Sequence, residues 1–445
     1  MENMRWCHRR YAAPRLQAAT GTVTVLDVGG ANVNGSYADL FRGPNLRYLG
    51  TDLQPGEGVD LVLEDPYRFP LPDASVDFVI SGQMLEHCEF FWLAFAEMVR
   101  VLKPDGYLFL IAPSAGPIHR YPVDCYRFYP DAYRALAKHA GCHLVDLRHD
   151  ERAPWNDLVG VFAKIAQPKR RPAPAVWAPA PHRPRWPADS DEEKVGGARP
   201  YLELMAELHE TLQPRAYLEI GVRFGRSLQL ARCPALGVDP LPELQVELPP
   251  TTEVVAMGSD DFFDDEAERL AALAPDFVFI DGMHLFEYAL RDFMHVERAV
   301  GPGTVVVIDD VFPRHPAQAL RERATRSWTG DVWRLLPTLQ ANRPDLMLVA
   351  LDTAPTGLLL IVGLDAGQRG LWQRYNALAT TAQRKPVDPP PKILARRGAL
   401  RPEGPACREV LELLRVFRGE AATDAAGARE RLRAALRARG ALLER

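Results

Sequence analysis

The feature that most constrains the fold of this sequence is an internal repeat. Four blocks in its first half recur in the same order about 190 residues downstream. In the clearest pair, VDFVISG at 76–82 returns as PDFVFID at 275–281. The other pairs are VTVLDVGG (23–30) with RAYLEIGV (215–222), YLGTD (48–52) with ALGVD (235–239), and KPDGYLFLIAP (103–113) with GPGTVVVIDDV (301–311). A nearly constant offset over four blocks predicts two copies of one domain type.

Within each copy, short apolar and β-branched runs alternate with helical patterns. This alternation predicts an α/β fold in which helices cover a parallel sheet. In the first copy we expect strands at 23–27, 48–52, 76–81, 107–112 and 158–164. In the second copy we expect strands at 216–220, 236–239, 277–281, 304–309, 346–351 and 357–362.

A proline-rich segment separates the copies. Residues 168–187 hold seven prolines in twenty positions, and proline lacks the N–H that helices and sheets need. A semi-stiff, solvated tether explains this segment better than a ligand for an SH3 domain. After residue 407, Leu, Ala, Arg and Glu recur at helical spacing. We therefore expect a first domain at 1–166, a linker at 167–198, a second domain at 199–364 and a helical C-terminal extension at 365–445.

Charge and composition exclude several classes of protein. The 53 basic and 58 acidic residues give a net charge of −5, which argues against a general nucleic-acid binder. No apolar stretch is long enough for a membrane span, and the N-terminus lacks the apolar core of a secretory signal. The six cysteines form no CxxC pair, so we expect reduced thiols and a cytoplasmic protein.

Both copies place an acid and then a glycine at the end of their first predicted strand. The acid is Asp27 in the first copy and Glu219 in the second. Open α/β sheets bind ligands at this edge, and glycine lets the backbone approach a ligand closely. Asp52 and Asp239 end the second strands, where a carboxylate suits the hydroxyls of a ribose.

The acid at the end of the first strand separates two kinds of nucleotide ligand. A dinucleotide needs a GxGxxG cradle for its pyrophosphate, which neither copy has, and a carboxylate there would repel the pyrophosphate. The same carboxylate would attract the ammonium and sulfonium groups of S-adenosylmethionine. Electrostatics therefore favours this methyl donor over a nicotinamide cofactor.

On these residues both copies resemble class I S-adenosylmethionine-dependent methyltransferases. The resemblance implies two Rossmann-like domains with mostly parallel seven-stranded sheets. The first copy is similar to the broad family with LEH and LKPGG motifs, through VLDVGG (25–30), GTD (50–52), LEDPYRFPLP (63–72), VDFVISGQMLEH (76–87) and VLKPDGYL (101–108). Ala31, Val33 and Asp105 replace glycines that are usual in that family. The resemblance implies that Asp27 and Gly29 line the methionine end of the donor, that Asp52 binds its ribose and that Asp65 lies beside its adenine.

The second copy resembles O-methyltransferases that act on sugars of macrolides and related glycosides. The similarity lies in YLEIGVRFGRSL (217–228), LGVDP (236–240), SDDFF (259–263), FIDGMHLFEYALRDF (279–293) and VVIDDV (306–311). It implies that Asp239 binds the ribose of the donor and Asp260 its adenine side. The other implied donor contacts are Glu219, Gly221, Gly225 and Ser227.

A candidate metal and base occur in the second copy. Asp281, Asp309 and Asp310 follow neighbouring strands, so their carboxylates could meet one hard cation such as Mg²⁺. The cation would lower the pKa of one of two vicinal hydroxyls, and His284 could accept its proton. The resemblance implies the same arrangement. In the alternative interpretation, Asp309 and Asp310 cap the next helix and His284 is an ordinary loop residue.

The first copy lacks these residues at the aligned positions, so any methylation there would proceed without this metal. Its own candidates are Glu86–His87 and the segment HRYPVDCYRFYPD at 119–131. Four side chains of that segment suit a polar, sugar-like acceptor: His119, Asp124, Tyr126 and Arg127. A structured lid explains them equally well.

The sequence thus predicts a tandem methyltransferase that acts on a small-molecule or glycan substrate. In the main alternative only one domain is catalytic, and the N-terminal copy binds the acceptor or mediates dimerisation. The sequence leaves the oligomeric state open, a homo-oligomer included.

Overall fold

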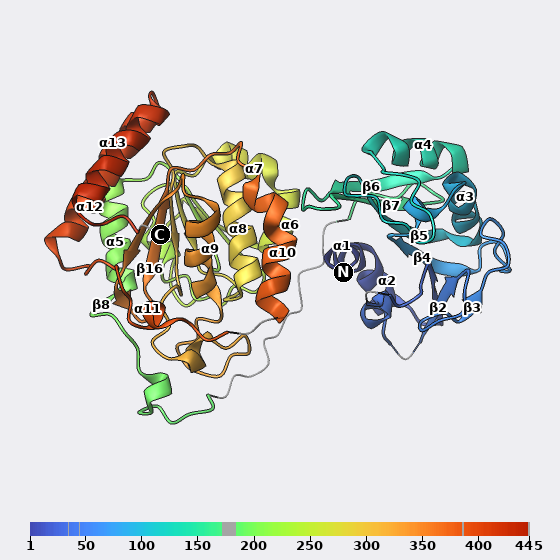
Figure 1. The fold of residues 1–445 in the computed structure, drawn as a ribbon, viewed down its shortest axis with the longest axis horizontal. Helices are drawn as coiled ribbons and strands as arrows, with labels where there is room; N and C mark the ends of the chain where they lie inside the picture. The colour runs from blue at the N-terminus through green and yellow to red at the C-terminus, as the bar shows by residue number, and fades with distance from the viewer. Residues whose placement is uncertain (34, 44, 171–183, 385–386, 444–445) are drawn as a thin grey trace. The chain divides into compact units, whose positions relative to one another are not determined.

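The structure, a computed structural model, describes residues 1–33, 35–43, 45–170, 184–384 and 387–443. The chain forms two compact units, Met1–Ala173 and Pro174–Arg445 (Figure 1). The centre of the predicted linker, residues 171–183, lies outside the described residues. None of the helices within the described ranges combines the length and apolar character needed to cross a membrane.

The first unit contains a seven-stranded sheet of order β3-β2-β1-β4-β5-β7-β6. Neighbouring strands are parallel, except that β7 is antiparallel to β5 and β6. The strands are β1 (Val23–Val28), β2 (Leu46–Asp52), β3 (Leu61–Val62), β4 (Val76–Gly82), β5 (Leu102–Pro113), β6 (His143–His149) and β7 (Asp157–Ala163). The helices are α1 (Glu2–Cys7), a π-helical turn (His8–Ala12), α2 (Ala13–Ala18), α3 (Phe91–Val101) and α4 (Pro130–Ala140).

Burial on both faces explains the apolar character of the central strands. All residues of β4 from Val76 to Ser81 are buried, which is typical of a parallel strand covered by helices. Because successive side chains alternate across a sheet, Phe78 packs with Tyr11 on one face, and Val79 packs with Phe95 of α3 on the other.

The second unit repeats this topology with the order β11-β10-β9-β12-β13-β16-β14. As with β7 in the first sheet, one strand runs in the opposite direction: β16 is antiparallel to β13 and β14. The strands are β9 (Tyr217–Ile220), β10 (Ala235–Asp239), β11 (Thr252–Ala256), β12 (Phe277–Ile280), β13 (Val305–Ile308), β14 (Met347–Leu351) and β16 (Leu358–Val362), with a separate pair of β8 (Arg199–Pro200) and β15 (Thr353–Ala354). The shared order confirms the predicted pair of mostly parallel seven-stranded domains.

Helices cover both faces of the second sheet, and those of the C-terminal region are part of this cover (Figure 1). The helices are α5 (Tyr201–Leu212), α6 (Ser259–Asp265), α7 (Ala267–Leu273), α8 (Phe286–Ala299), α9 (Leu335–Asn342), α10 (Gly370–Arg384), α11 (Pro391–Leu394), α12 (Pro405–Ala421) and α13 (Ala425–Ala438). Tyr375 of α10 packs in one core cluster with Leu290 of α8. Leu411 of α12 packs with Leu208 of α5 in the other cluster.

Besides the separate pair β8 and β15, three strands of the two seven-stranded sheets lie outside the segments predicted from the sequence. They are β3 and β6 in the first unit and β11 in the second, and all three form sheet edges. An edge strand buries less of its surface, so its apolar run is broken by polar residues, as in HLVDLRH of β6.

Candidate functional site

In both units the first strand ends in a turn that glycine alone accommodates without strain. Gly29 has a φ of +82° and Gly221 a φ of +90°. A Cβ on Gly29 would lie 2.7 Å from Cγ of Met84, and one on Gly221 would overlap the carbonyl oxygen of Asp281. Each turn therefore packs against the loop after the fourth strand of its sheet. The backbone of both loops lies at the edge where open α/β sheets bind ligands.

The acid before each turn is buried in the sheet. Asp27 accepts a 2.5 Å hydrogen bond from the hydroxyl of Tyr48. Glu219 accepts 2.7 Å hydrogen bonds from the hydroxyls of Tyr217 and Ser227. Burial raises the pKa of Asp27 to about 6 and that of Glu219 to about 8. At pH 7 Glu219 is therefore mainly protonated until a cation lies beside it, so its charge depends on what binds.

The acids that end the second strands lie beside these turns. Asp52 accepts a 2.7 Å hydrogen bond from the backbone N–H of Leu53. Asp239 accepts hydrogen bonds from the backbone N–H groups of Val222 (3.0 Å) and Arg223 (2.8 Å). The carboxylate of Asp239 thus joins the end of β10 to the glycine turn, the place expected for a ribose-binding group.

The remaining predicted donor contacts have varied surroundings. Asp65 is exposed and accepts a 2.8 Å hydrogen bond from the backbone N–H of Tyr67. Asp260 forms a 2.6 Å hydrogen-bonded ion pair with buried Arg291, so an adenine would share this carboxylate with the guanidinium. Gly225 adopts a φ of +78°. The hydroxyl of Ser227 donates its hydrogen bond to Glu219.

In the second unit Asp281, His284 and Asp310 form a compact cluster. Their candidate ligand atoms lie within 4.8 Å of one another. Nδ1 of His284 lies 2.6 Å from Oδ2 of Asp310, and Nε2 lies 3.6 Å from Oδ1 of Asp281. The three side chains line a small cavity of about 10 Å³, which is room for one water molecule or ion.

Burial and the neighbouring carboxylates together determine the pKa values in this cluster. Burial, reinforced by the nearby Asp309 and Asp310 carboxylates, raises the pKa of Asp281 well above its usual range. Burial would lower the pKa of His284, but Asp310 and Asp281 outweigh this effect and raise the pKa to about 9. The ring of His284 also stacks on Trp328 with an interplanar angle of 1°. Crowded carboxylates around a fixed imidazole are a donor set that a divalent cation would neutralise.

Asp309 lines the same cavity, but it is not one of the three residues whose ligand atoms lie within 4.8 Å of one another. Its Oδ1 accepts hydrogen bonds from the hydroxyl of Thr356 (2.9 Å) and from the backbone N–H of Asp310 (2.7 Å). Neither acid caps a helix, because β13 ends at Ile308 and the next helical turn begins at Pro316. In the described structure the three-residue cluster thus forms without Asp309.

In the first unit the segment after β5 is held by an ion pair. The carboxylate of Asp124 accepts hydrogen bonds of 2.6 and 2.8 Å from the guanidinium of Arg127. Arg127 keeps the pKa of this carboxyl well below its usual range. Arg127 also donates to the carbonyl of Pro117, and the hydroxyl of Tyr126 donates to the carbonyl of Glu89. These contacts fix the conformation of the segment and are compatible with both an acceptor site and a structured lid.

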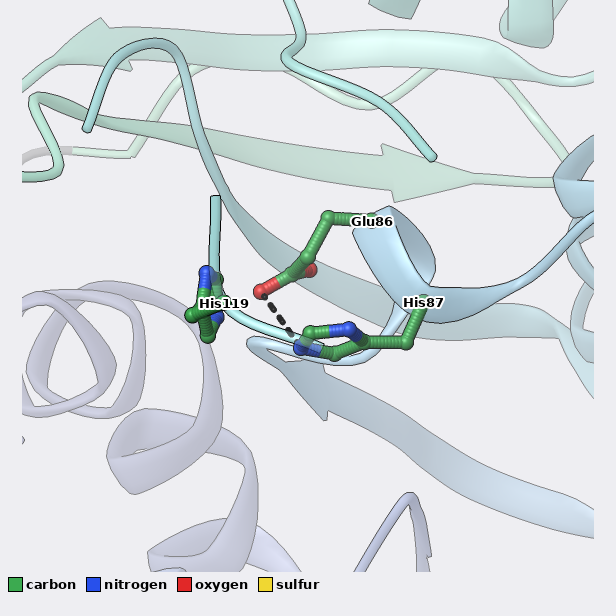
Figure 2. Close-up of side chains that lie close together, drawn as sticks. All are labelled: Glu86, His87 and His119. Atoms are coloured by element: carbon green, nitrogen blue, oxygen red, sulfur yellow. Dashed lines mark ion pairs between the residues drawn. The ribbon is translucent and has the colours of Figure 1, made fainter. Parts of the chain in front are cut away.

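The structure also joins Glu86, His87 and His119, which the sequence singles out separately. Their candidate ligand atoms lie within 4.8 Å of one another, and the side chains point toward a shared space (Figure 2). Nε2 of His87 lies 3.7 Å from Oε1 of Glu86. Burial raises the pKa of Glu86 to about 8. The sequence held one signal for this grouping: Glu86 and His87 follow the fourth strand, His119 follows the fifth, and these strands are neighbours in the sheet.

Comparisons with known proteins support both units independently. Residues 16–110 match one family model described as a methyltransferase domain, and residues 218–311 match a second model with the same description. An uncharacterized methyltransferase of Mycolicibacterium gilvum (strain PYR-GCK) is 31% identical over 195 residues, which cover 38% of this chain and 71% of the relative. One of Mycobacterium ulcerans (strain Agy99) is 30% identical over 190 residues, which cover 38% of this chain and 72% of the relative.

Solved structures give partial matches. A 1,6-didemethyltoxoflavin-N1-methyltransferase of Burkholderia thailandensis, solved with S-adenosylhomocysteine, matches at 17% identity and a TM-score of 0.29, covering 36% of this chain and 76% of that one. An Aquifex aeolicus SAM-dependent methyltransferase matches at 18% identity and a TM-score of 0.27, covering 36% of this chain and 96% of that one.

The two family models, the curated relatives and the repeated sheet lead to one conclusion: this chain belongs to the S-adenosylmethionine-dependent methyltransferases and carries two methyltransferase domains in tandem.

Proposed function

We propose that the second domain is a metal-assisted O-methyltransferase that acts on a hydroxyl of a sugar or glycosylated metabolite. The first domain is a second donor-dependent methyltransferase, whose acceptor binds near His119. The observation that carries the proposal is the meeting of Asp281, His284 and Asp310 at the carboxyl ends of β12 and β13.

The donor would supply an electrophilic methyl group on a positively charged sulfur. In the second domain Glu219 balances the positive charge, and the Gly221 turn with Gly225 gives the backbone close access. Asp239 binds the ribose and Asp260 the adenine side. In the first domain Asp27 balances the charge and Gly29 forms the turn. Asp52 binds the ribose, and Asp65 lies on the adenine side.

The residues around His284 fit a hard divalent cation such as Mg²⁺. Asp281 and Asp310 offer carboxylate oxygens beside a cavity the size of one ion, and their mutual repulsion favours a cation. When bound, the cation would lower the pKa of an acceptor hydroxyl.

His284 is the proposed base for that hydroxyl. Its Nδ1 is fixed by Asp310 and by the carbonyl oxygen of Trp328, 2.8 Å away. Because the carboxylates raise its pKa to about 9, His284 carries a proton at neutral pH while their charge is unbalanced. We therefore expect it to accept a proton only after that charge is neutralised.

A mass-shift screen tests the proposal. The full chain is incubated with S-adenosylmethionine, Mg²⁺ and a panel of glycosides and polyols, and products are weighed by mass spectrometry. We expect a gain of one or two methyl units that Asp310→Asn reduces by at least one unit. Asp388→Asn, on the exposed surface, is the matched control. Methylation that is restricted to nitrogen or carbon atoms, or unchanged by Asp310→Asn, would contradict the proposal.

The alternative of a single catalytic domain makes a different prediction in the same screen. If the first domain only binds the acceptor, Asp27→Asn leaves the number of added methyl groups unchanged. If both domains work, Asp27→Asn and Glu219→Gln remove different methyl groups.

A further inference from the structure

We propose that Glu86, His87 and His119 form a binding site for one divalent transition-metal ion of the Zn²⁺ class in the first domain. The three side chains come from the two loops that follow β4 and β5 (Figure 2). This site is separate from the Asp281 cluster and uses none of its residues.

Unpartnered polar atoms are the first observation behind the site. The side chain of Glu86 is 0% exposed, yet neither of its carboxylate oxygens has a hydrogen-bond partner among the described residues. Nδ1 of His119 is also buried and has no hydrogen bond within the described structure, although it lies 3.4 Å from a carboxylate oxygen of Asp124. Burying a carboxyl without a hydrogen-bond partner is costly, and a cation held between Glu86 and the two imidazoles would offset that cost.

The orientation of the imidazoles is the second observation. Nδ1 of His87 lies 2.5 Å from the carbonyl oxygen of Val123, to which it donates its proton. The lone pair of Nε2 is then left facing Glu86, 3.7 Å away. Two ligands of a tetrahedral Zn²⁺ are about 3.4 Å apart, so this pair needs little adjustment. A backbone carbonyl that orients a ligand histidine in this way is a common feature of metal sites.

His119 is held in place by groups outside the site. Its backbone N–H donates a 2.7 Å hydrogen bond to Asp124, and Nδ1 lies 3.4 Å from the same carboxylate. Its ring packs on Trp155 with centroids 4.4 Å apart and meets the ring of His87 at 4.7 Å. The ion pair of Asp124 with Arg127 therefore keeps the loop, and with it His119, against Glu86.

The donor set indicates the kind of ion. Two imidazoles and one carboxylate suit Zn²⁺ and related transition metals, whereas the two carboxylates and one imidazole of the second domain suit a harder ion. Three protein ligands leave one position open for a further ligand. The ligand loop also touches the donor turn, because Met84, two residues before Glu86, packs against Gly29. Any role of this ion in holding the acceptor rests on the proposed function. Binding of the ion to Glu86, His87 and His119 does not depend on that function.

The two domains gather their ligand-type side chains in equivalent loops. Asp281 and His284 follow β12, and Asp310 follows β13, which correspond to β4 and β5. The residues themselves differ, since the repeat aligns His284 with Leu85 and Glu86 with Leu285. The first domain thus does not repeat the ligand residues proposed for the second, yet it carries different ligand-type residues at the same edge.

Metal content of the full chain tests the proposal. The protein is dialysed against Zn²⁺ with excess Mg²⁺, which occupies harder sites, and bound zinc is measured by mass spectrometry. We expect one zinc ion per chain in the wild type. Glu86→Gln and His119→Gln should each reduce zinc affinity at least about tenfold. His143→Gln, an exposed histidine of the same domain, is the matched control, and Asp310→Asn separates this site from the other cluster.

The outcomes are distinct. Loss of zinc in Glu86→Gln and His119→Gln, with full retention in His143→Gln and Asp310→Asn, supports the site whether or not the second domain methylates a sugar. Circular dichroism shows whether Glu86→Gln is folded; if it is not, partly exposed His119 provides the same test. A wild type without zinc, or zinc retained by both variants, would overturn the proposal.

Discussion

Asp27 and Glu219 occupy equivalent positions in the two sheets. Asp27 pairs with Gly50 on β2 and with Ile80 on β4, and Glu219 pairs with Gly237 on β10 and Phe279 on β12. Both acids precede a glycine turn, but burial raises the pKa of Asp27 to about 6 and that of Glu219 to about 8. The same place in the fold thus has a different charge at neutral pH in each domain.

This difference predicts a pH dependence of donor binding in the second domain. A cation favours the ionised form of Glu219, so binding releases a proton below pH 8 and affinity rises with pH until that point. Between pH 6 and 8 the affinity should rise about 50-fold at the second site and about twofold at the first. Isothermal titration of Asp27→Asn reports the second site, and titration of Glu219→Gln reports the first.

Because both sites take the same donor, the titration of the donor itself cancels in this comparison. Equal pH profiles for the two sites would show that the charge of Glu219 does not control binding.

Replacing Glu219 by Gln should weaken donor binding without unfolding the domain. The amide keeps the shape of the side chain but cannot gain the charge that balances the donor. At pH 8.5 we expect the Kd of the second site to increase about ten- to a hundredfold, or about 1.4–2.8 kcal/mol. At pH 6 the variant and the wild type should differ little. Glu247→Gln, an exposed acid of the same domain, serves as control, and an equal loss there would rule out a local effect.

The glycine turn of the second domain should not tolerate a side chain. In Gly221→Ala the methyl group would overlap the carbonyl of Asp281 at a φ of +90°. We expect the free energy of unfolding of this domain to fall by about 2 kcal/mol or more, together with loss of donor binding. Denaturant unfolding measures the first effect. Gly301→Ala has open space around it and should change stability by less than about 0.5 kcal/mol; similar losses in both variants would contradict a special role for the turn.

Removal of divalent metal should silence the second domain and spare its donor site. A chelator removes the ion, and Asp310→Asn removes one of its proposed ligands, so we expect methyl transfer to fall at least about a hundredfold in both cases. Donor affinity, measured by titration, should change less than about threefold. Product formation that persists after both treatments would leave the cluster with a structural role.

Much of the fold could be predicted because its signals are local. Four repeated blocks and buried apolar strands such as Val76–Gly82 define the two sheets. The edge strands β3, β6 and β11 could not be predicted from the sequence, since their pairing depends on a neighbour that is distant in sequence.

The candidate sites divide in a similar way. The turns at Gly29 and Gly221 are visible in the sequence, but the charge of Glu219 depends on burial, which the sequence does not report. The different surroundings of Asp309 and Asp310 could not be predicted from spacing alone: Asp309 accepts a hydrogen bond from Thr356, whereas Asp310 lies beside His284. The meeting of His119 with Glu86 depends on the path of the loop after β5.

The stoichiometry of donor binding tests the central claim most directly. Titration of the full chain with S-adenosylmethionine should give two molecules bound per chain, with Asp27→Asn weakening one site and Glu219→Gln the other. A parallel titration with the dinucleotide NAD⁺ should give no binding, because neither turn has the GxGxxG pattern that cradles a pyrophosphate. Binding of NAD⁺ at either site, or donor binding indifferent to both substitutions, would contradict the account.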